Sequence, residues 1–187
     1  IIVGGSVADN VSVEVPGGVV RAYDARSGAL VWYWDPIHPD QKPVLAEDGS
    51  QRYQRGTTNV WSIISVDPEL NQIYLPTGNT SPDNYGGHRN GSDYYSSSVV
   101  SLDATTGKVL WHFQTVHHDI WDYDLPAAPN LIDIVVNEQP IKALAQVSKQ
   151  GFLFVFDRAT GEPVWPITET AVPSSDIPGE RAALTQP

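Results

Sequence analysis

The stretch HHDIWDYD, residues 117–124, combines two adjacent histidines, three aspartates and two aromatic residues in eight positions. A carboxylate in such a stretch can take the proton of a substrate hydroxyl group that lies within hydrogen-bonding distance. The histidines suggest a metal site, because imidazole is a common ligand of transition metals. Adjacent residues of an extended chain point to opposite faces, however, so His117 and His118 are not expected to share one ion. We interpret the two rings as packing groups or as supports for neighbouring side chains.

A repeated pattern predicts the elements that would position these residues. Residues 22–32, 101–111 and 155–165 each carry Asp, then Ser or Thr, then Gly and finally Trp at the same spacing. Asp and Ser or Thr can close a tight turn through side-chain hydrogen bonds, and Gly readily adopts a positive φ. Each segment therefore predicts a strand, a turn and a second strand, whose Trp packs against a neighbouring unit. A further strand pair is predicted at 58–67 and 72–78.

The predicted fold is all-β. No segment has convincing helical periodicity, and β-branched and aromatic residues dominate the apolar runs. Units of about four antiparallel strands that each end in a Trp-bearing hairpin favour the blades of a β-propeller, while a two-sheet sandwich is the alternative. The approximate blades are 1–36, 57–115 and 127–167. About three blades cannot close a ring, so residues 1–187 are predicted to be a fragment of a single propeller domain.

Composition narrows the classes of partner. The 187 residues include 22 acidic and 11 basic side chains, and the net charge of −11 argues against nucleic acid, because repulsion would oppose binding to phosphates. No apolar run approaches the length that spans a bilayer, although an anchor could lie outside this fragment. The chain has no cysteine, which excludes disulfides and thiolate metal sites within it. It also has no methionine and opens with IIVGG, which is typical of the middle of a strand.

The tryptophan repeat resembles the tryptophan docking motif of quinoprotein dehydrogenases, which are eight-bladed propellers that carry pyrroloquinoline quinone. The segments between the repeats are similar to active-site segments of that family and occur in the same order. The resemblance covers essentially the whole chain. Residues 115–129 (TVHHDIWDYDLPAAP) and 85–90 (YGGHRN) resemble the membrane-bound glucose and quinate branch most closely. The other similar segments are GGSVADN at 4–10, TNVW at 58–61, PTGN at 76–79 and VSKQG at 147–151.

The resemblance implies two catalytic residues. Asp122, directly after Trp121, matches the proposed general base, and Lys149 matches a basic residue that hydrogen-bonds the quinone carbonyl oxygens. The implied mechanism is concerted, with hydride passing from the substrate carbon to the quinone while Asp122 takes the hydroxyl proton. Without the resemblance, Asp122 would be read as a capping acid and Lys149 as a surface lysine. Asp119 and Asp124 are expected to be structural and to bind backbone N–H groups of the turn.

The resemblance also implies contacts to the cofactor. Trp61 is similar to the tryptophan that forms a flat floor beneath the quinone, and offset stacking suits that task. Asn59, two residues earlier on an extended strand, would face the same side and could bind the polar rim of the cofactor. Ser6 is a weaker cofactor contact. The alternative for Trp61 is packing between blades.

The implied metal site contains oxygen ligands, which hard cations prefer. Asp9 stands where the family has a glutamate ligand, Asn79 matches an asparagine ligand, and Asp122 completes the set. Asn10 is a substitute for Asp9. The shorter Asp leaves Ca²⁺ and Mg²⁺ both open. Each of these residues would otherwise be read as an ordinary loop residue.

The expected function is oxidation of a sugar or cyclic polyol, with glucose, quinate or shikimate as candidate substrates and ubiquinone as the acceptor of the whole enzyme. The resemblance places such enzymes in the bacterial periplasm, associated with the inner membrane. We expect no activity from residues 1–187 alone. The alternative is a non-catalytic propeller that serves as a scaffold for protein partners in the bacterial envelope, which would explain the tryptophan repeats but not the polar residues between them.

Overall fold

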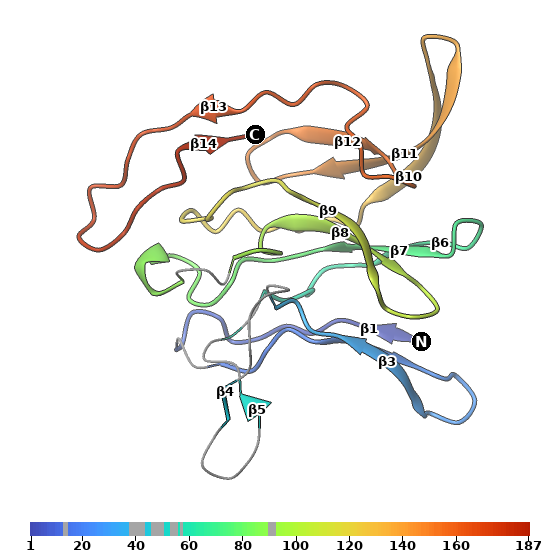
Figure 1. Cartoon of the computed structure of the whole chain (residues 1–187), viewed down its shortest axis with the longest axis horizontal. Helices are drawn as coiled ribbons and strands as arrows, with labels where there is room; N and C mark the ends of the chain where they lie inside the picture. The colour runs from blue at the N-terminus through green and yellow to red at the C-terminus, as the bar shows by residue number, and fades with distance from the viewer. Residues whose placement is uncertain (13–14, 38–43, 46–50, 53–55, 57, 90–92) are drawn as a thin grey trace.

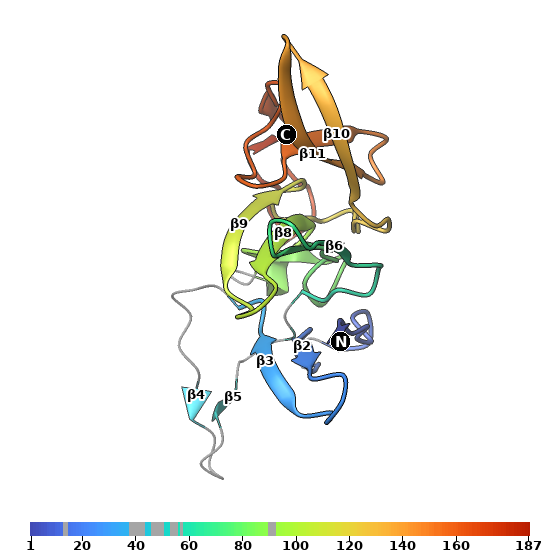
Figure 2. The same ribbon diagram turned by 90° about the vertical axis from the view of Figure 1, so that its right-hand side faces the viewer.

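The computed structural model describes residues 1–12, 15–37, 44–45, 51–52, 56, 58–89 and 93–187. Three antiparallel sheets, with strand orders β1-β2-β3, β6-β7-β8-β9 and β10-β11-β12, follow one another along the molecule (Figures 1 and 2). Their strands are β1 (Ile2–Val3), β2 (Val20–Tyr23), β3 (Leu30–Trp34), β6 (Ser65–Asp67), β7 (Gln72–Pro76), β8 (Ser98–Asp103), β9 (Val109–Gln114), β10 (Asn130–Val136), β11 (Gln139–Val147) and β12 (Leu153–Asp157).

Two short strand pairs and one helical turn lie outside the three sheets. The pairs are β4 (Val44–Leu45) with β5 (Gln51–Arg52) and β13 (Thr170–Ala171) with β14 (Thr185–Gln186), and η1 (Gly86–His88) is a 3₁₀ turn. Within the described part of the chain there is no α-helix, which confirms the all-β prediction. No described helix has the length and apolar character needed to cross a membrane. Within the predicted blades, residues 13–14, 57 and 90–92 lie outside the described residues.

The middle sheet is buried on both faces. Along β7, Ile73 and Leu75 pack into a core shared with the first sheet, whereas Tyr74 between them packs into a core shared with the third sheet. Side chains alternate between the two faces of a strand, so a strand covered on both sides must be apolar or fully hydrogen-bonded throughout. All five residues of β7 are accordingly buried. Successive sheets that cover each other face to face are the arrangement of propeller blades.

The repeated tryptophans join one sheet to the next. The Trp32 Nε1 atom donates a hydrogen bond to the carbonyl oxygen of Ala104 at 3.0 Å, and Trp111 does the same to Arg158 at 3.2 Å. The ring of Trp111 lies against Gly161, where an added Cβ would come within 2.5 Å of it. The predicted packing of these residues against a neighbouring unit is confirmed. Trp165 has no later blade within this chain and is 53% exposed.

The two ends of the sheets differ. The turns after β2, β6, β8 and β10 lie on the right in Figure 1, whereas the long connections from one sheet to the next and the turn between β11 and β12 lie on the left. We call these the hairpin end and the loop end. The loop end includes residues 58–64, which were predicted to begin a strand. That prediction is wrong, because the strand starts only at Ser65 and the preceding residues enter the loop end.

Candidate active site

Asp122 and Lys149 come together at the loop end. Lys149 follows β11, and its Nζ atom donates to the backbone carbonyl oxygen of Asp122 at 2.7 Å and to the carboxylate oxygen Oδ2 at 3.4 Å. The two residues are 27 positions apart, and their side chains are 32% and 39% exposed. The ammonium group of Lys149 is thereby held beside the accessible carboxylate of Asp122. The structure therefore brings together the two residues that the resemblance implies to be catalytic.

Asp124 connects this pair to Trp61. Its carboxylate oxygen Oδ2 accepts a hydrogen bond from Trp61 Nε1 at 3.0 Å and lies 3.8 Å from Lys149 Nζ, while Oδ1 accepts the backbone N–H of Asn79 at 2.5 Å. Burial raises the pKa of Asp124, although these donors oppose the shift. Gly78 permits the close approach, because a Cβ there would lie 3.1 Å from Trp61 Nε1. Asp124 therefore holds the edge of an indole that remains 42% exposed.

Asp119 shapes the turn that carries Asp122. Its carboxylate accepts the backbone N–H groups of Trp121 at 2.9 Å and Tyr123 at 2.7 Å, together with the Ser97 hydroxyl at 2.7 Å. Asp119 is fully buried, and burial raises its pKa. Between the two bonded N–H groups, Asp122 adopts a φ of 58°, a left-handed conformation that is unusual for a residue other than glycine. The prediction that Asp119 binds backbone N–H groups of the turn is confirmed.

The side chain of Asn79 is a buried cross-link between loops. Its Nδ2 atom donates to the carbonyl oxygens of Asp83 and Asp119, both at 2.8 Å. Its amide oxygen accepts from the backbone N–H of Thr80 at 2.8 Å and from Arg89 at 3.1 Å. The fully buried Arg89 also donates to the carbonyl oxygen of Asp119. Asn79 thus lies at the site but uses its oxygen within the protein.

The N-terminal loop supplies the remaining predicted residues. Asn59, which is fully buried, donates through Nδ2 to Asp9 Oδ2 at 3.1 Å. Asn10 accepts a hydrogen bond from Asn84 at 3.4 Å, which links the same loop to residues 83–84. Ser6 is exposed in this loop. The structure therefore brings Asp9 to Asn59, not directly to the pair of Asp122 and Lys149.

Asp83 is a buried acid that no sequence motif distinguishes. It is 5% exposed, and burial followed by the charges of Asp9, Asp122 and Asp124 raises its pKa to about 7, while Arg89 opposes the shift. Its Oδ1 atom has no hydrogen-bond partner among the described residues. Leaving a buried polar atom unpaired costs about 1–3 kcal/mol. A Pro-Asp-Asn sequence is typical of any turn, so only the three-dimensional arrangement distinguishes Asp83.

Comparison with known proteins identifies the family. The model of the glucose/ethanol/alcohol dehydrogenase β-propeller domain, which is named for PQQ, matches residues 1–187. The chain belongs to this family. It is 44% identical over its whole length to the quinate/shikimate dehydrogenase (quinone) of Acinetobacter baylyi and 41% identical to the quinoprotein glucose dehydrogenase of Escherichia coli. The chain spans 23% of the length of each of these two relatives.

Solved structures of quinohemoprotein alcohol dehydrogenases have a similar fold. The enzyme ADHIIG of Pseudomonas putida HK5 matches 98% of this chain with a TM-score of 0.73 and 27% identity, and the matched part is 28% of that chain. The enzyme of Comamonas testosteroni matches 97% with a TM-score of 0.72 and 28% identity, over 29% of that chain. The three sheets of this quinoprotein-family chain are therefore part of a propeller.

The residues of this PQQ-family domain fit a flat cofactor and a hard cation. Trp61 offers an exposed indole whose edge is held by Asp124. Two buried oxygens, Asn59 Oδ1 and Asp83 Oδ1, accept no hydrogen bond within the described part of the chain, and unpaired oxygens are suitable cation ligands. In that same part, no three His, Cys, Asp or Glu side chains form a metal-binding group. A cation here would therefore need amide or cofactor oxygens as well as carboxylates.

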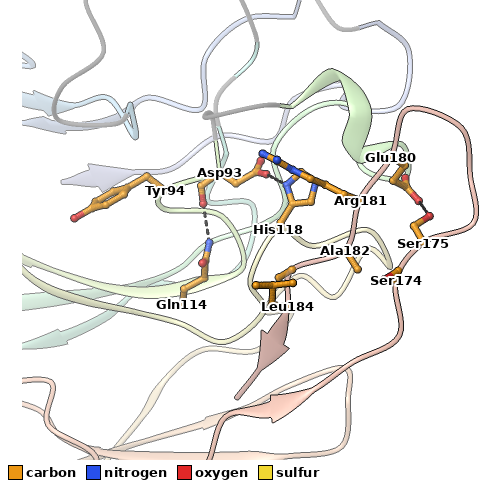
Figure 3. Close-up of a pocket in the computed structure, with 11 residues that line it drawn as sticks. Asp93, Tyr94, Gln114, His118, Ser174, Ser175, Glu180, Arg181, Ala182 and Leu184 are labelled. Carbon is orange, nitrogen blue, oxygen red and sulfur yellow. Dashed lines mark hydrogen bonds and ion pairs between the residues drawn. The ribbon is translucent and has the colours of Figure 1, made fainter.

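The two histidines of this quinoprotein-family domain face different partners. His117 contacts Gln114 at 2.8 Å and Glu169 at 2.9 Å, whereas His118 contacts Asp93 at 2.5 Å. The extended chain expected at these two residues does not form, because they lie in a turn in which His118 has a φ of 42°, and their rings nevertheless contact different residues. His118 and Asp93 line a hollow with a volume of about 700 Å³, which residues 174–175 and 180–184 also line (Figure 3). None of the predicted site residues lines it.

Proposed function

We propose that the full-length protein containing this chain oxidises a hydroxyl group of a sugar or cyclic polyol, with pyrroloquinoline quinone as the bound electron acceptor. One observation carries the proposal: Lys149 Nζ lies 2.7 Å from the carbonyl oxygen of Asp122 and 3.4 Å from its carboxylate. Asp124 joins this pair to the exposed indole of Trp61. Family membership and relatives named as dehydrogenases support the same function.

The residues of the chain have separate tasks in this proposal. The Asp122 carboxylate accepts the proton of the substrate hydroxyl group, and the left-handed turn presents it to solvent. Lys149 holds Asp122 in place and provides positive charge where negative charge develops on an oxygen. Trp61 supports the flat ring of the cofactor, while Asn59 and Ser6 contribute polar contacts from the same end. When bound, the quinone supplies the two-electron acceptor that allows the alcohol carbon to become a carbonyl carbon.

A divalent cation completes the proposed site. Ca²⁺ and Mg²⁺ both prefer oxygen ligands, and the sequence pattern assigns Asp9, Asn10, Asn79 and Asp122 to this role. The unpaired buried oxygens at the same end support the presence of a cation. The amide oxygen of Asn79 already accepts two hydrogen bonds, so its contribution to ligation is the weakest of the four.

The substrate and the final acceptor are proposed from the relatives. One is named a quinate/shikimate dehydrogenase (quinone), another a quinoprotein glucose dehydrogenase and a third the glycerol dehydrogenase large subunit of Gluconobacter oxydans. We therefore propose a polyol or sugar as substrate and ubiquinone as the acceptor of the whole enzyme. The proposed location is the periplasm, with an attachment to the inner membrane outside residues 1–187.

The direct test is reconstitution of the full-length protein. The metal-free, cofactor-free protein would be titrated with pyrroloquinoline quinone in the presence of Ca²⁺ or Mg²⁺, and cofactor uptake followed by quenching of tryptophan fluorescence. Dye reduction would then be measured with glucose, quinate, shikimate and glycerol. We expect saturable uptake and cofactor-dependent reduction with at least one of these substrates.

A matched variant separates cofactor support from folding. Trp61→Leu should weaken quinone binding at least about tenfold, because it removes the aromatic platform. Tyr33→Leu replaces another exposed aromatic residue, on β3, and should leave quinone binding unchanged. Absence of cofactor uptake by the folded wild-type protein would contradict the proposal and favour a scaffold for protein partners.

A further inference from the structure

Asn59 Oδ1 and Asp83 Oδ1 are two of the buried oxygens that have no hydrogen-bond partner among the described residues. Asn59 is fully buried, and its amide nitrogen is used by Asp9, which leaves Oδ1 without a donor among the described residues. Asp83 is 5% exposed, and its backbone carbonyl accepts hydrogen bonds from Asn79 and Arg89, while Oδ1 of its carboxylate accepts none in that same part of the chain. Folded proteins pair nearly all such atoms, so these two require an explanation.

The charges around these oxygens favour a cation. Asp9, Asp122 and Asp124 all act on Asp83 as like charges, and Asp9 has the largest influence of the three. Lys149 lies with Asp122 and Asp124, and Arg89 opposes part of the charge near Asp83. The side of the cluster that contains Asp9 and Asp83 has no ion pair between described residues that involves either carboxylate. A cation bound between the loop of Asp9 and the loop of Asp83, which the hydrogen bond from Asn84 to Asn10 links, would relieve the repulsion.

We infer that Asp83 is a ligand of the divalent cation, together with Asp9 and the amide oxygen of Asn59. Two carboxylates and one amide oxygen match the preference of Ca²⁺ or Mg²⁺ and neutralise its charge. Asp122 is held by Lys149 and is left out of this set, which then contains only two carboxylates; among the described residues no three His, Cys, Asp or Glu side chains form a metal-binding group. The inference deepens the proposed function and rests on it for the identity of the cation as the one that accompanies the cofactor.

The same geometry gives Asn79 a different role. Both lone pairs of its amide oxygen are used, by Thr80 and Arg89, and its amide nitrogen bonds two carbonyl oxygens. A metal ligand must offer a free lone pair, so the Asn79 side chain is a positioning group that holds the loop containing Asp83. The cation ligand contributed by this loop is therefore Asp83 and not Asn79.

Cation binding by the full-length protein tests the inference without an activity assay. The EDTA-treated, quinone-free protein would be titrated with Ca²⁺ and with Mg²⁺ by calorimetry, and its melting temperature measured with and without each ion. Asp83→Asn should weaken the affinity at least about tenfold and abolish the rise in melting temperature that the ion causes in the wild type. Asp103→Asn, at the hairpin end, should retain both properties of the wild type.

A second variant should increase the affinity for the cation instead of lowering it. Asn59→Asp adds a carboxylate to the set, so the metal-free protein should melt at a lower temperature and Ca²⁺ should bind at least about threefold more tightly than in the wild type. This result remains informative if Asp83→Asn fails to fold. Wild-type affinity in folded Asp83→Asn, or unchanged affinity in Asn59→Asp, would overturn the inference.

The outcomes also separate this inference from the proposed function. Cation binding that depends on Asp83, without quinone-dependent dye reduction, would sustain the ligand assignment and contradict the dehydrogenase. Dye reduction by the wild type together with wild-type cation affinity in Asp83→Asn would sustain the dehydrogenase and overturn the ligand assignment.

Discussion

Two aspartates at opposite ends of the middle sheet make the same three kinds of hydrogen bond in different surroundings. Asp103, at the hairpin end, accepts two backbone N–H groups and the Thr106 hydroxyl at 2.7–3.0 Å. Asp119, at the loop end, accepts two backbone N–H groups and the Ser97 hydroxyl at 2.7–2.9 Å. The bonds from Thr106 lower the pKa of Asp103, whereas burial raises the pKa of Asp119.

The difference shows how the two ends use the same chemistry. The turn at Asp103 is exposed at Thr105 and Thr106, and Gly107 with a φ of 71° provides its left-handed residue. The turn at Asp119 is buried, and its left-handed residues are His118 and Asp122, which are not glycines. Unusual backbone conformations outside glycine are costly and persist where the surroundings enforce them. The turns of the hairpin end thus stabilise the fold. At the loop end, the strained backbone at His118 and Asp122 lowers stability but fixes the position of the Asp122 side chain.

The largest effect is expected on turnover, when the proposed base Asp122 at the loop end is replaced. In the full-length enzyme, Asp122→Asn should lower turnover about 10²- to 10⁴-fold, because the amide cannot accept the substrate proton. Quinone binding, measured by fluorescence titration, should change little. Asp103→Asn should reduce turnover less than about twofold, since the Asp103 carboxylate bonds its own turn and Asn71, all at the hairpin end. Near-normal turnover in Asp122→Asn would remove its role as the base.

The hairpin end should respond in stability instead. Gly161 has a φ of 80° and lies against the Trp111 ring, whereas Gly151 at the loop end has a φ of 84° and no atom within 4 Å of an added Cβ. Both Ala variants bear the left-handed strain, but only Gly161→Ala also disturbs the tryptophan docking. We expect Gly161→Ala to lower the free energy of unfolding of the full-length protein by about 1–3 kcal/mol more than Gly151→Ala. Equal losses in urea unfolding would show that docking contributes little.

The sequence predicted the hairpin end more completely than the loop end. The pattern of Asp, Gly and Trp is local, so the turns at Gly28, Gly107 and Gly161 and the docking of the tryptophans follow from short-range rules. The strand predicted at 58–64 does not form, because residues there are bound by other loops: Asn59 donates to Asp9, and Trp61 donates to Asp124. Tertiary contacts override the local preference for an extended strand.

Some residues of the candidate site could likewise be predicted from the sequence, and others could not. The resemblance to a family located Asp122, Lys149 and Trp61, and the structure brings these three together with Asp124. It did not reveal Asp83, since a buried unpaired oxygen is a property of several loops and not of a sequence motif. The role of Asn79 also depends on Arg89, ten residues away, whose buried side chain occupies the amide oxygen.

A smaller effect on turnover is expected at Asp119, the loop-end member of the aspartate pair. Asp119→Asn replaces an acceptor oxygen with a donor nitrogen, so the turn that holds Asp122 loses one of its bonds, which costs about 1–3 kcal/mol. Turnover should fall about tenfold while the KM for the substrate changes little, because the base is displaced but the substrate site remains. Asp103→Asn should lower stability with unchanged turnover. An equal loss of turnover in both variants would reduce Asp119 to a purely structural residue.

The smallest effect should appear only in acid, at a buried ion pair of the hairpin end. Asp67 is 3% exposed, and although burial raises its pKa, the hydrogen bond from Arg158 at 2.6 Å and two backbone N–H groups outweigh burial and lower it overall. A lowered pKa in the folded state contributes stability that is complete above the unfolded pKa, near 4, and is lost as the pH falls through the folded value.

The full-length protein should therefore lose on the order of 1 kcal/mol of unfolding free energy below about pH 4 through this group. Asp67→Asn should flatten that part of the pH profile, measured by urea unfolding between about pH 3 and pH 6. Asp133→Asn removes the other carboxylate bound to Arg158, which is 75% exposed, and should change the acid slope much less. Equal slopes in the wild type and Asp67→Asn would mean that the charge of Asp67 adds little to stability and that Arg158 is held mainly by its hydrogen bonds to backbone carbonyl groups within the third sheet.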